Sequence, residues 1–311
     1  MIFVSIASYR DPELLLTIKN LIEKAYNPKN IIIGVCQQND SDKFITTEYD
    51  NVRFLNFKPE ISKGVCWARN KSNSMYNGEE LFLQCDSHME FVQDWDRLIA
   101  NEVCMANKLT NNPVLFAAYP SAYQFKNGIR FFVGNPKIYL TKLMFMDHPS
   151  SIILTGYAIK NNVILGRPIK SRYLNGGFMF GNGAFLRDIK IDTDIYFHGE
   201  EIMTTLKAYT NGYDLFHPSR HICWHNYNRL KDHGDFVYHW NQDDESKRIV
   251  KWRTLDDKSK KRVAEIISGI YKGGNELGSV RTIQDYEKYA CVKFRNRIVY
   301  GDGLTGIYKD N

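Results

Sequence analysis

The stretch IFVSIASYRDPELLLTIKNLIEKAYNPKNIIIGVC (residues 2–36) decides the fold of this chain. It begins with an apolar run over residues 2–7 and ends with a second apolar run over residues 30–36. Between the two runs, Pro12 precedes a segment whose leucines and isoleucines recur at helical spacing. Two continuous apolar strands joined by a helix indicate a parallel pair that is buried on both faces, because a half-exposed strand would alternate apolar and polar residues.

The same alternation continues through the first third of the chain. Residues 52–57 (VRFLNF) and 80–86 (ELFLQCD) predict two further buried strands, and residues 67–78 predict a helix that ends at an Asn-Gly pair. We therefore expect an α/β fold of the Rossmann-like type, with a mostly parallel central sheet.

Polar residues directly follow three of the predicted strands. They are Asp11, Gln37 and Asp86. Ligands of open parallel sheets bind outside the carboxyl ends of the strands. We therefore expect these three loops to converge on one crevice.

Beyond residue 110 the pattern is dominated by strands that are separated by Asn, Gly and Pro turns. Four segments predict strands: residues 114–120, 129–134, 151–159 and 175–186. A helix follows over residues 199–212, and a further strand pair is predicted over residues 213–227. Near residues 230–245 the composition becomes charged and aromatic, which makes this region a candidate domain boundary. Helical patterns return over residues 256–271 and 281–290.

The composition is that of an ordinary folded protein, with 43% hydrophobic and 24% charged residues among 311. No stretch approaches the roughly 18 apolar residues of a membrane span, and the N-terminal segment predicts the first strand of the fold instead of a signal peptide. The six cysteines are isolated from one another, which predicts free thiols in a reducing, cytoplasmic setting. The net charge of +6 is spread along the chain, and the cluster at residues 258–262 is interpreted as a solvated surface, so we expect no nucleic-acid partner.

The strongest chemical signal is Asp86-Ser87-His88, which comes at the end of a predicted strand. One carboxylate and one imidazole on alternate residues would point to the same side of an extended backbone. Such a pair also occurs by chance in solvated loops. A second group of histidines follows in the segment HPSRHICWHNY: His217, His221 and His225. A mixed Asp/His set suits Mn²⁺ with phosphate oxygens completing the coordination, whereas each histidine alone is more simply a core or edge residue.

Two acidic residues, Glu200 and Glu201, open the helix predicted at residue 199. The helix dipole favours carboxylates there in any protein, but a pair beside a metal ion and a phosphate donor would also orient an acceptor hydroxyl or stabilise a developing cation. Gly176 and Gly177 would allow the backbone to approach a ligand closely, and a β-bulge is the alternative interpretation.

Basic residues that could neutralise a diphosphate lie upstream of the Asp-Ser-His segment. They are Lys63 and Arg69, and as isolated residues both are more simply explained as surface charges.

Four segments in order along the chain resemble one enzyme family. They are SIASYRDPELLLTIKNLIEKAYNPKNIIIGVCQQ, KGVCWARN, FLQCDSHMEFVQDWD and LGSVRTIQDYEKYACVKF. Together they are similar to the GlcNAc-transferase family that includes the polypeptide and hydroxyproline α-N-acetylglucosaminyltransferases. More distantly, NGGFMFG, FHGEEI and CWHNY occur in the order of related segments in the mucin-type polypeptide GalNAc-transferases.

The resemblance implies a GT-A catalytic domain, which we expect over residues 1–235, with a small helical appendage over residues 236–311. It also implies Mn²⁺ or another divalent cation, UDP-GlcNAc as donor, retention of anomeric configuration, and a protein or glycan hydroxyl as acceptor. By the same comparison the metal ligands are Asp86, His88 and His225, with His221 as the second choice for the third ligand.

The first loop would hold the uridine, with Tyr9 stacked on the base; its residues are Ala7, Ser8, Tyr9 and Arg10. Lys63 and Arg69 would flank the phosphates, Ser87 would be a spacer or a minor nucleotide contact, and Glu200 or Glu201 would act at the sugar.

This sequence departs from the GalNAc-transferase pattern at two positions. The segment Gly199-Glu200-Glu201 lacks the asparagine of those enzymes, and Trp224 replaces the glycine before the histidine. The resemblance therefore supports metal binding more directly than it supports a particular donor sugar or acceptor.

Two alternatives remain open at this point. An inverting GT-A transferase of polysaccharide or lipopolysaccharide synthesis would share the nucleotide half and need a catalytic base, for which Glu201 or Asp194 would serve. A non-catalytic nucleotide-sugar-binding protein would keep the fold with a degenerate site.

Overall fold

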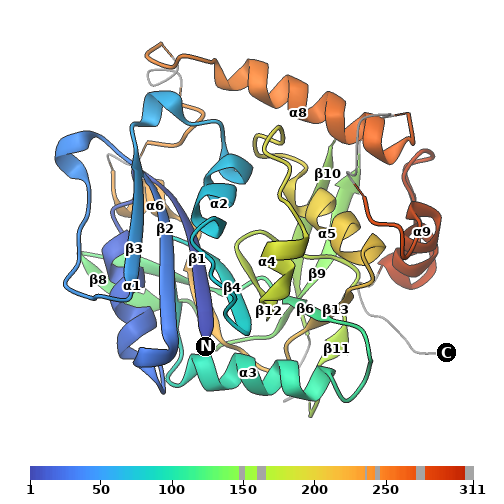
Figure 1. Ribbon diagram of the computed structural model, residues 1–311, viewed down its shortest axis with the longest axis horizontal. Helices are drawn as coiled ribbons and strands as arrows, with labels where there is room; N and C mark the ends of the chain where they lie inside the picture. The colour runs from blue at the N-terminus through green and yellow to red at the C-terminus, as the bar shows by residue number, and fades with distance from the viewer. Residues whose placement is uncertain (147–150, 160–165, 235–236, 242–245, 271–276, 305–311) are drawn as a thin grey trace.

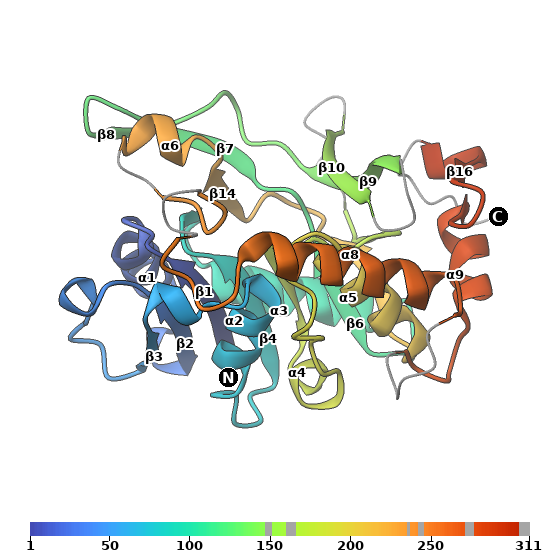
Figure 2. The same ribbon diagram turned by 90° about the horizontal axis from the view of Figure 1, so that it is seen from above.

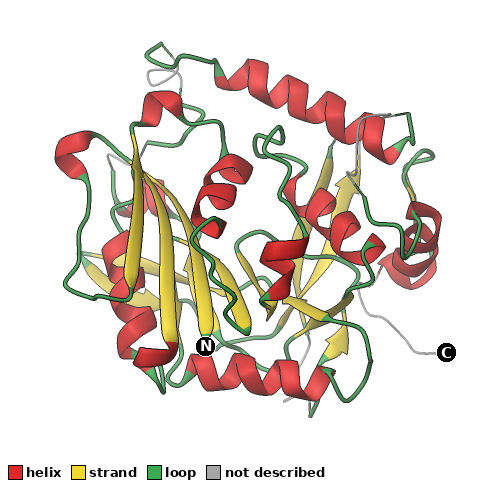
Figure 3. Ribbon diagram, in the orientation of Figure 1, coloured by secondary structure: helices red, strands yellow, loops and turns green. Residues whose placement is uncertain are grey.

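The computed structural model describes residues 1–146, 151–159, 166–234, 237–241, 246–270 and 277–304. Its centre is an eight-stranded sheet with the strand order β11-β13-β6-β12-β4-β1-β2-β3. Figure 1 shows the chain entering this sheet at its N-terminus, and Figure 3 shows helices on both sides of the strands. The predicted α/β fold with a mostly parallel sheet is confirmed.

The parallel half of the sheet comes from the first ninety residues. Its strands are β1 (Ile2–Tyr9), β2 (Ile31–Gln38), β3 (Val52–Phe57) and β4 (Leu81–Asp86). β1 pairs in parallel with both β2 and β4, and β2 pairs in parallel with β3. These strands lie within two residues of the predicted ranges. β1, β2 and β4 are buried, as a mainly apolar run predicts, whereas β3 forms the edge of the sheet and exposes Arg53 and Asn56, so its predicted burial is wrong.

The other half of the sheet mixes strand directions. It contains β6 (Val114–Ala117), β11 (Ile169–Lys170), β12 (Phe178–Asn182) and β13 (Asp214–His217). β12 lies antiparallel between β4 and β6, whereas β13 pairs in parallel with β6. The strand predicted over residues 175–186 is only partly correct, because its last three residues belong to the helix α4 (Ala184–Asp188).

A smaller sheet carries part of the candidate site. Its strand order is β5-β14-β7-β8, with β5 (Met89–Phe91), β14 (Cys223–Asn226), β7 (Ser121–Lys126) and β8 (Ile129–Phe132). The predicted pairing within residues 213–227 is wrong, because β13 joins the large sheet and β14 joins this one. Two separate hairpins complete the strands: β9 (Tyr139–Met146) with β10 (Ile152–Ala158), and β15 (Val292–Lys293) with β16 (Ile298–Val299). In the view of Figure 2, the smaller sheet and the β9–β10 hairpin lie on one side of the molecule and α4 lies on the other.

Helices cover both faces of the large sheet. The remaining ones are α1 (Leu14–Glu23), α2 (Val65–Asn73), α3 (Trp95–Ala106), α5 (Glu200–Thr210), α6 (Arg229–Asp232), α8 (Trp252–Ile267) and α9 (Ile283–Ala290). α1 and α3 bury Ile18 and Trp95 in one core cluster with alternate residues of β1 such as Val4. Phe3 faces the opposite side and packs with Phe185 of α4. The helix predicted to end at Asn77-Gly78 instead ends at residue 73.

The C-terminal helices share a third hydrophobic cluster with α5. Val263 of α8 and Tyr286 of α9 pack there with Met203. In the view of Figure 1, α8 runs across the end of the molecule opposite the N-terminus. A separate appendage beginning at residue 236 stays a prediction. Within the described residues, no helix combines the length and the apolar character needed to cross a membrane.

Candidate active site

A cavity of about 420 Å³ lies at the carboxyl ends of β1 and β4. The sequence predicted a crevice at this place, because the ends of parallel strands meet at one edge of a sheet. Twelve of the predicted site residues line it: Ala7, Ser8, Tyr9, Arg69, Asp86, Ser87, His88, Gly176, Gly177, Glu200, Glu201 and His225.

Two predicted nucleotide-binding residues do not line this cavity. Lys63 is exposed, and Arg10 forms an ion pair with Asp40 at 3.2 Å. Gln37 was expected to face the crevice, but its amide donates to the carbonyl of Ile45 and the side chain of Asn56. Alternation along β2 turns its neighbour Gln38 into the cavity instead.

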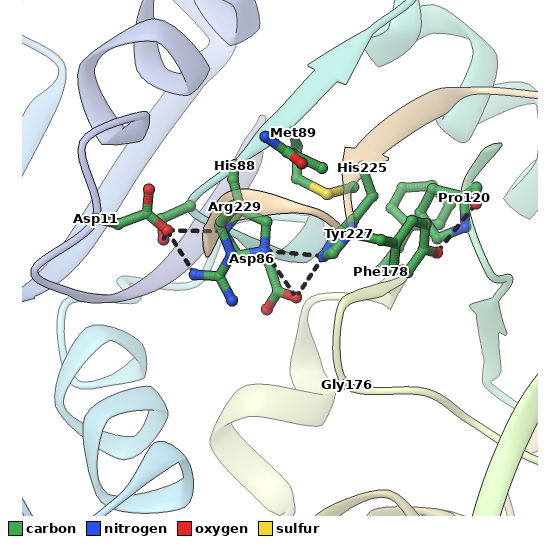
Figure 4. Close-up of polar contacts among 12 residues, drawn as sticks. Asp11, Asp86, His88, Met89, Pro120, Gly176, Phe178, His225, Tyr227 and Arg229 are labelled. Carbon is green, nitrogen blue, oxygen red and sulfur yellow. Dashed lines mark hydrogen bonds and ion pairs between the residues drawn. The ribbon is translucent and has the colours of Figure 1, made fainter. Parts of the chain in front are cut away.

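Three side chains converge on one point inside the cavity: Asp86 and His88 from the end of β4 and His225 from β14 (Figure 4). The two histidine Nε2 atoms are 2.9 Å apart, and Asp86 Oδ2 lies 3.2 Å from Nε2 of His225 and 3.8 Å from Nε2 of His88. Neighbouring donor atoms around an octahedral ion with bonds near 2.1 Å are about 3 Å apart. The three donors therefore fit a divalent cation, and the nitrogen and oxygen donor set suits Mn²⁺ among others.

The surroundings of this cluster favour the protonation states in which histidine and aspartate bind metal ions. Burial lowers the pKa of His225 to about 4, and the neighbouring His88 adds to this effect. Burial alone would raise the pKa of Asp86, but the hydrogen bond from His225 and the positive charge of Arg69 are among the effects that outweigh it and hold the pKa below its ordinary value. A neutral imidazole and an ionised carboxylate are the forms that bind metal ions.

The other two histidines of the predicted group lie elsewhere. His217 is fully buried, and its ring contacts the carbonyl of Ala117 at 2.8 Å and the backbone N–H of Thr141 at 3.3 Å. His221 packs its ring against Trp224, with 4.3 Å between the ring centroids. Among the described residues, the cluster of metal-binding groups contains neither of them.

Arg69 of α2 organises the acidic side of the cavity. Its side chain is only 4% exposed and contacts Glu200 at 2.9 Å, Asp86 at 3.2 Å and the carbonyl of Gly176. Two carboxylates therefore already balance the guanidinium charge. This arrangement favours a positioning role for Arg69 over direct neutralisation of a diphosphate.

Glu201 has a different environment from its neighbour Glu200. It is half-buried, lines the cavity, and accepts the backbone N–H of Gly176 at 3.1 Å. Burial raises its pKa to about 7, and the charge of Glu200 acts in the same direction. Its carboxyl group can therefore exchange a proton near neutral pH.

The glycine pair before β12 permits these close approaches. A Cβ on Gly176 would lie 2.7 Å from Oε2 of Glu200, and a Cβ on Gly177 would lie 3.0 Å from Oδ2 of Asp86. The backbone at Gly176 and Gly177 therefore lies close to two carboxylates that line the cavity, whereas the sequence predicted a close approach to a ligand.

Several residues that line the cavity were not predicted from the sequence. They are Gln38, Ser62, Phe197, Arg229, Tyr238, His239 and Trp240. The aromatic character of residues 237–240 was visible in the sequence, but no pattern indicated that this segment returns to the cavity. Tyr196 contacts this segment, since its hydroxyl lies 2.6 Å from Nδ1 of His239.

Comparisons with known proteins agree with this geometry. A family model described as Glycosyltransferase (GlcNAc) matches residues 1–53 and 41–296. A structure of GalNAc-T7 with UDP, GalNAc and Mn²⁺ aligns with a TM-score of 0.57 at 12% identity, over 95% of this chain and 55% of that one. This chain thus spans about half the length of that relative, and the likeness identifies the fold as GT-A.

Two further solved structures align less closely. The S. aureus TarS 1-349 structure with UDP-GlcNAc gives a TM-score of 0.46 at 14% identity, over 83% of this chain and 70% of that one. The mannosyltransferase PcManGT from Pyrobaculum calidifontis, with GDP-Man and Mn²⁺, gives 0.48 at 13% identity, over 86% and 69%. No curated protein sequence matches the chain.

Proposed function

The chain belongs to the Glycosyltransferase (GlcNAc) family, and we propose that it transfers GlcNAc from UDP-GlcNAc to a hydroxyl acceptor with retention of configuration and with the help of Mn²⁺. The observation that carries this proposal is the convergence of Asp86, His88 and His225 in the cavity at the ends of the parallel strands. The bound UDP, GalNAc and Mn²⁺ of the GalNAc-T7 structure support a nucleotide sugar and a divalent cation in the same fold.

The donor would bind along the carboxyl end of β1. Tyr9 lines the cavity and would stack on the uracil ring, while Ala7 and Ser8 bring backbone groups close to the nucleoside. Arg229, which also lines the cavity, contributes positive charge beside the cluster of metal-binding groups.

Asp86, His88 and His225 would hold the cation. When bound, the cation supplies Lewis-acid stabilisation of the UDP leaving group. Arg69, 3.2 Å from Asp86, would orient the Asp86 carboxylate, and Gly177 leaves room for it.

Glu201 would act on the sugar. An ionised carboxylate at this place would stabilise the positive charge that develops at the anomeric carbon or orient the sugar hydroxyls. Glu200 is engaged by Arg69, so Glu201 is the better placed of the two acidic residues. With Glu201 in this role, the acceptor hydroxyl would attack from the face on which UDP departs.

An inverting reaction is the second candidate, because Glu201, with a pKa of about 7, would also serve as a general base. Asp194, the other base considered from the sequence, is exposed and does not line the cavity. The anomer of the product, determined by NMR, distinguishes the two reactions.

The first experiment measures UDP release from UDP-GlcNAc with added Mn²⁺ and with EDTA. We expect turnover that depends on Mn²⁺ and is lost with EDTA; turnover unaffected by EDTA would contradict the metal role. Mass spectrometry of products from peptide and glycan acceptors would then identify the acceptor, for which protein Ser/Thr, hydroxyproline and glycan hydroxyls are the candidates.

A further inference from the structure

Asp11 is a buried carboxylate that lies directly behind the cluster of metal-binding groups. It is in the loop between β1 and α1, and its side chain has no exposed surface. Figure 4 shows it on the far side of His88 from His225. The cavity surface does not include it, so it would not touch a substrate.

Four donors surround this carboxylate. Oδ2 accepts from the Ser87 hydroxyl at 2.8 Å and from the Arg229 guanidinium at 3.0 Å, and it lies 2.7 Å from Nδ1 of His88. Oδ1 accepts the backbone N–H of Glu13 at 2.9 Å. A carboxylate held by this many donors has a fixed position and a fixed orientation.

The contact with His88 determines which ring nitrogen carries the proton. An ionised carboxylate can only accept hydrogen bonds, so Nδ1 of His88 must be the donor. In the neutral ring, Nε2 then keeps its lone pair, and this is the atom that lies 2.9 Å from His225. A metal ion binds an imidazole through such a lone pair.

Two neighbours that can only donate also contact Asp11. The Arg229 guanidinium, from the first residue of α6, pairs with Oδ2 at 3.0 Å, and the backbone N–H of Glu13 donates to Oδ1. Both oxygens of the carboxyl group therefore act as acceptors.

We propose that Asp11 is a positioning residue of the metal site: it fixes the Nδ1–H tautomer and the orientation of His88, so that Nε2 is ready to bind the cation. This inference rests on the proposed function, and it assigns a role to a residue that no sequence pattern marked as part of the metal site. Partners of this kind behind a ligating histidine typically change metal affinity by about 10- to 100-fold when they are removed.

A purely structural role is the competing explanation, because Asp11 also accepts a backbone N–H at the start of α1. Glu102 of α3 provides a matched control. Its buried carboxylate accepts from the hydroxyl and the backbone N–H of Ser219 and pairs with Arg220 at 3.4 Å, but it does not line the cavity. Replacement of either residue removes a buried carboxylate that accepts a hydroxyl and a backbone N–H. Only Asp11 also contacts a proposed metal ligand, His88.

The test compares Asp11→Asn with Glu102→Gln by calorimetric titration with MnCl₂ alone, after urea unfolding has confirmed that both variants fold. We expect the Kd for Mn²⁺ to rise about 10- to 100-fold in Asp11→Asn and to change less than about twofold in Glu102→Gln. Wild-type affinity in folded Asp11→Asn, or an equal loss in both variants, would overturn the proposal.

A second measurement needs no carboxylate variant and keeps the proposal testable if Asp11→Asn does not fold. Long-range ¹⁵N–¹H spectra of metal-free, histidine-labelled wild-type protein report the tautomer of each ring, and the signal of His88 is identified by its absence in His88→Gln. We expect Nδ1–H; an Nε2–H tautomer would overturn the proposal. Absence of Mn²⁺ binding by the wild-type protein would instead contradict the proposed function, and the role of Asp11 with it.

Discussion

Replacement of Glu201 by glutamine is the most informative single change to the cavity. Glutamine has the same size and keeps an oxygen that can accept the N–H of Gly176, which is 3.1 Å from Oε1 of the glutamate. The substitution removes the ability to ionise and replaces the second oxygen by an amide NH₂ group. Since burial raises the pKa of Glu201 from 4.5 to about 7, the wild-type fold has to accommodate a charge that it disfavours above neutral pH.

The expected effect on stability has a defined sign. The folded pKa is higher than the unfolded one, so the folded state holds the proton more tightly. The contribution of Glu201 to stability is therefore complete below pH 4.5 and is lost as the pH rises through about 7. A shift from 4.5 to about 7 corresponds to about 3 kcal/mol at 1.36 kcal/mol per unit, and this is an upper value because solvent reaches the half-buried group through the cavity.

Urea unfolding of the metal-free protein at pH 5 and at pH 8 measures this effect. We expect the free energy of unfolding of Glu201→Gln, minus that of the wild type, to increase by up to about 3 kcal/mol from pH 5 to pH 8. A difference between the two proteins that does not change with pH would refute the reasoning. If Glu201 acts on the sugar, the stabilised variant should also lose activity with Mn²⁺ and UDP-GlcNAc, which would separate stability from function.

Glu200→Gln is the matched control, because it changes the adjacent residue of the same helical turn. This glutamate forms a buried ion pair with Arg69 at 2.9 Å. Removal of one partner of such a pair is destabilising, here by about 3 kcal/mol, the lower end of the usual range, since Asp86 still contacts the guanidinium. Burial raises the pKa of Glu200 as well, so removal of its charge offsets part of this loss, and we expect Glu200→Gln to be less stable than Glu201→Gln at pH 8.

Three further predictions test the cavity and its support. His225→Ala should abolish Mn²⁺ binding in calorimetric titrations, whereas His221→Ala should leave it intact; equal affinities for both variants would contradict the ligand assignment. Gly64→Ala should lower the free energy of unfolding in urea by about 2 kcal/mol or more, because φ is +98° there and a Cβ would lie 2.1 Å from the carbonyl oxygen of Tyr196; an unchanged midpoint would contradict this. Tyr9→Ala should raise the Kd for UDP about tenfold through loss of base stacking, and an unchanged Kd would place the uracil elsewhere.

Local sequence patterns predicted the parallel half of the fold, because β1, β2 and β4 are buried on both faces and are mainly apolar. β3 was placed correctly as a strand, but it forms the edge of the sheet and exposes Arg53 and Asn56. Local patterns failed where pairing depends on distant segments. β13 and β14 are separated by only five residues but join different sheets, and β12 runs against its neighbours β4 and β6. Which edge a strand joins is decided by tertiary packing, which is not encoded in the alternation of the strand itself.

The candidate metal site of Asp86, His88 and His225 could be predicted from the sequence only with the help of the family resemblance. His88 and His225 are 137 residues apart, and spacing alone left three histidines as candidates for the third ligand. Asp11 was visible as a polar residue after a strand, but its contact with His88 depends on how the loop turns before α1. Lys63 was predicted to contact the phosphates because of its charge and its position in the sequence, but it is exposed and does not line the cavity.

The two neighbouring glutamates show why residue type and position along a helix are insufficient to assign a role. Successive residues of an α-helix point about 100° apart, so Glu200 reaches Arg69 while Glu201 reaches the backbone of Gly176. Gly176 serves both arrangements: its N–H binds one carboxylate, its carbonyl accepts from Arg69, and its missing Cβ leaves room for the other carboxylate, which would otherwise lie 2.7 Å away. The difference between a paired, structural carboxylate and one that can exchange a proton near neutral pH therefore arises from the backbone of a loop that is distant in sequence, and not from the glutamates themselves.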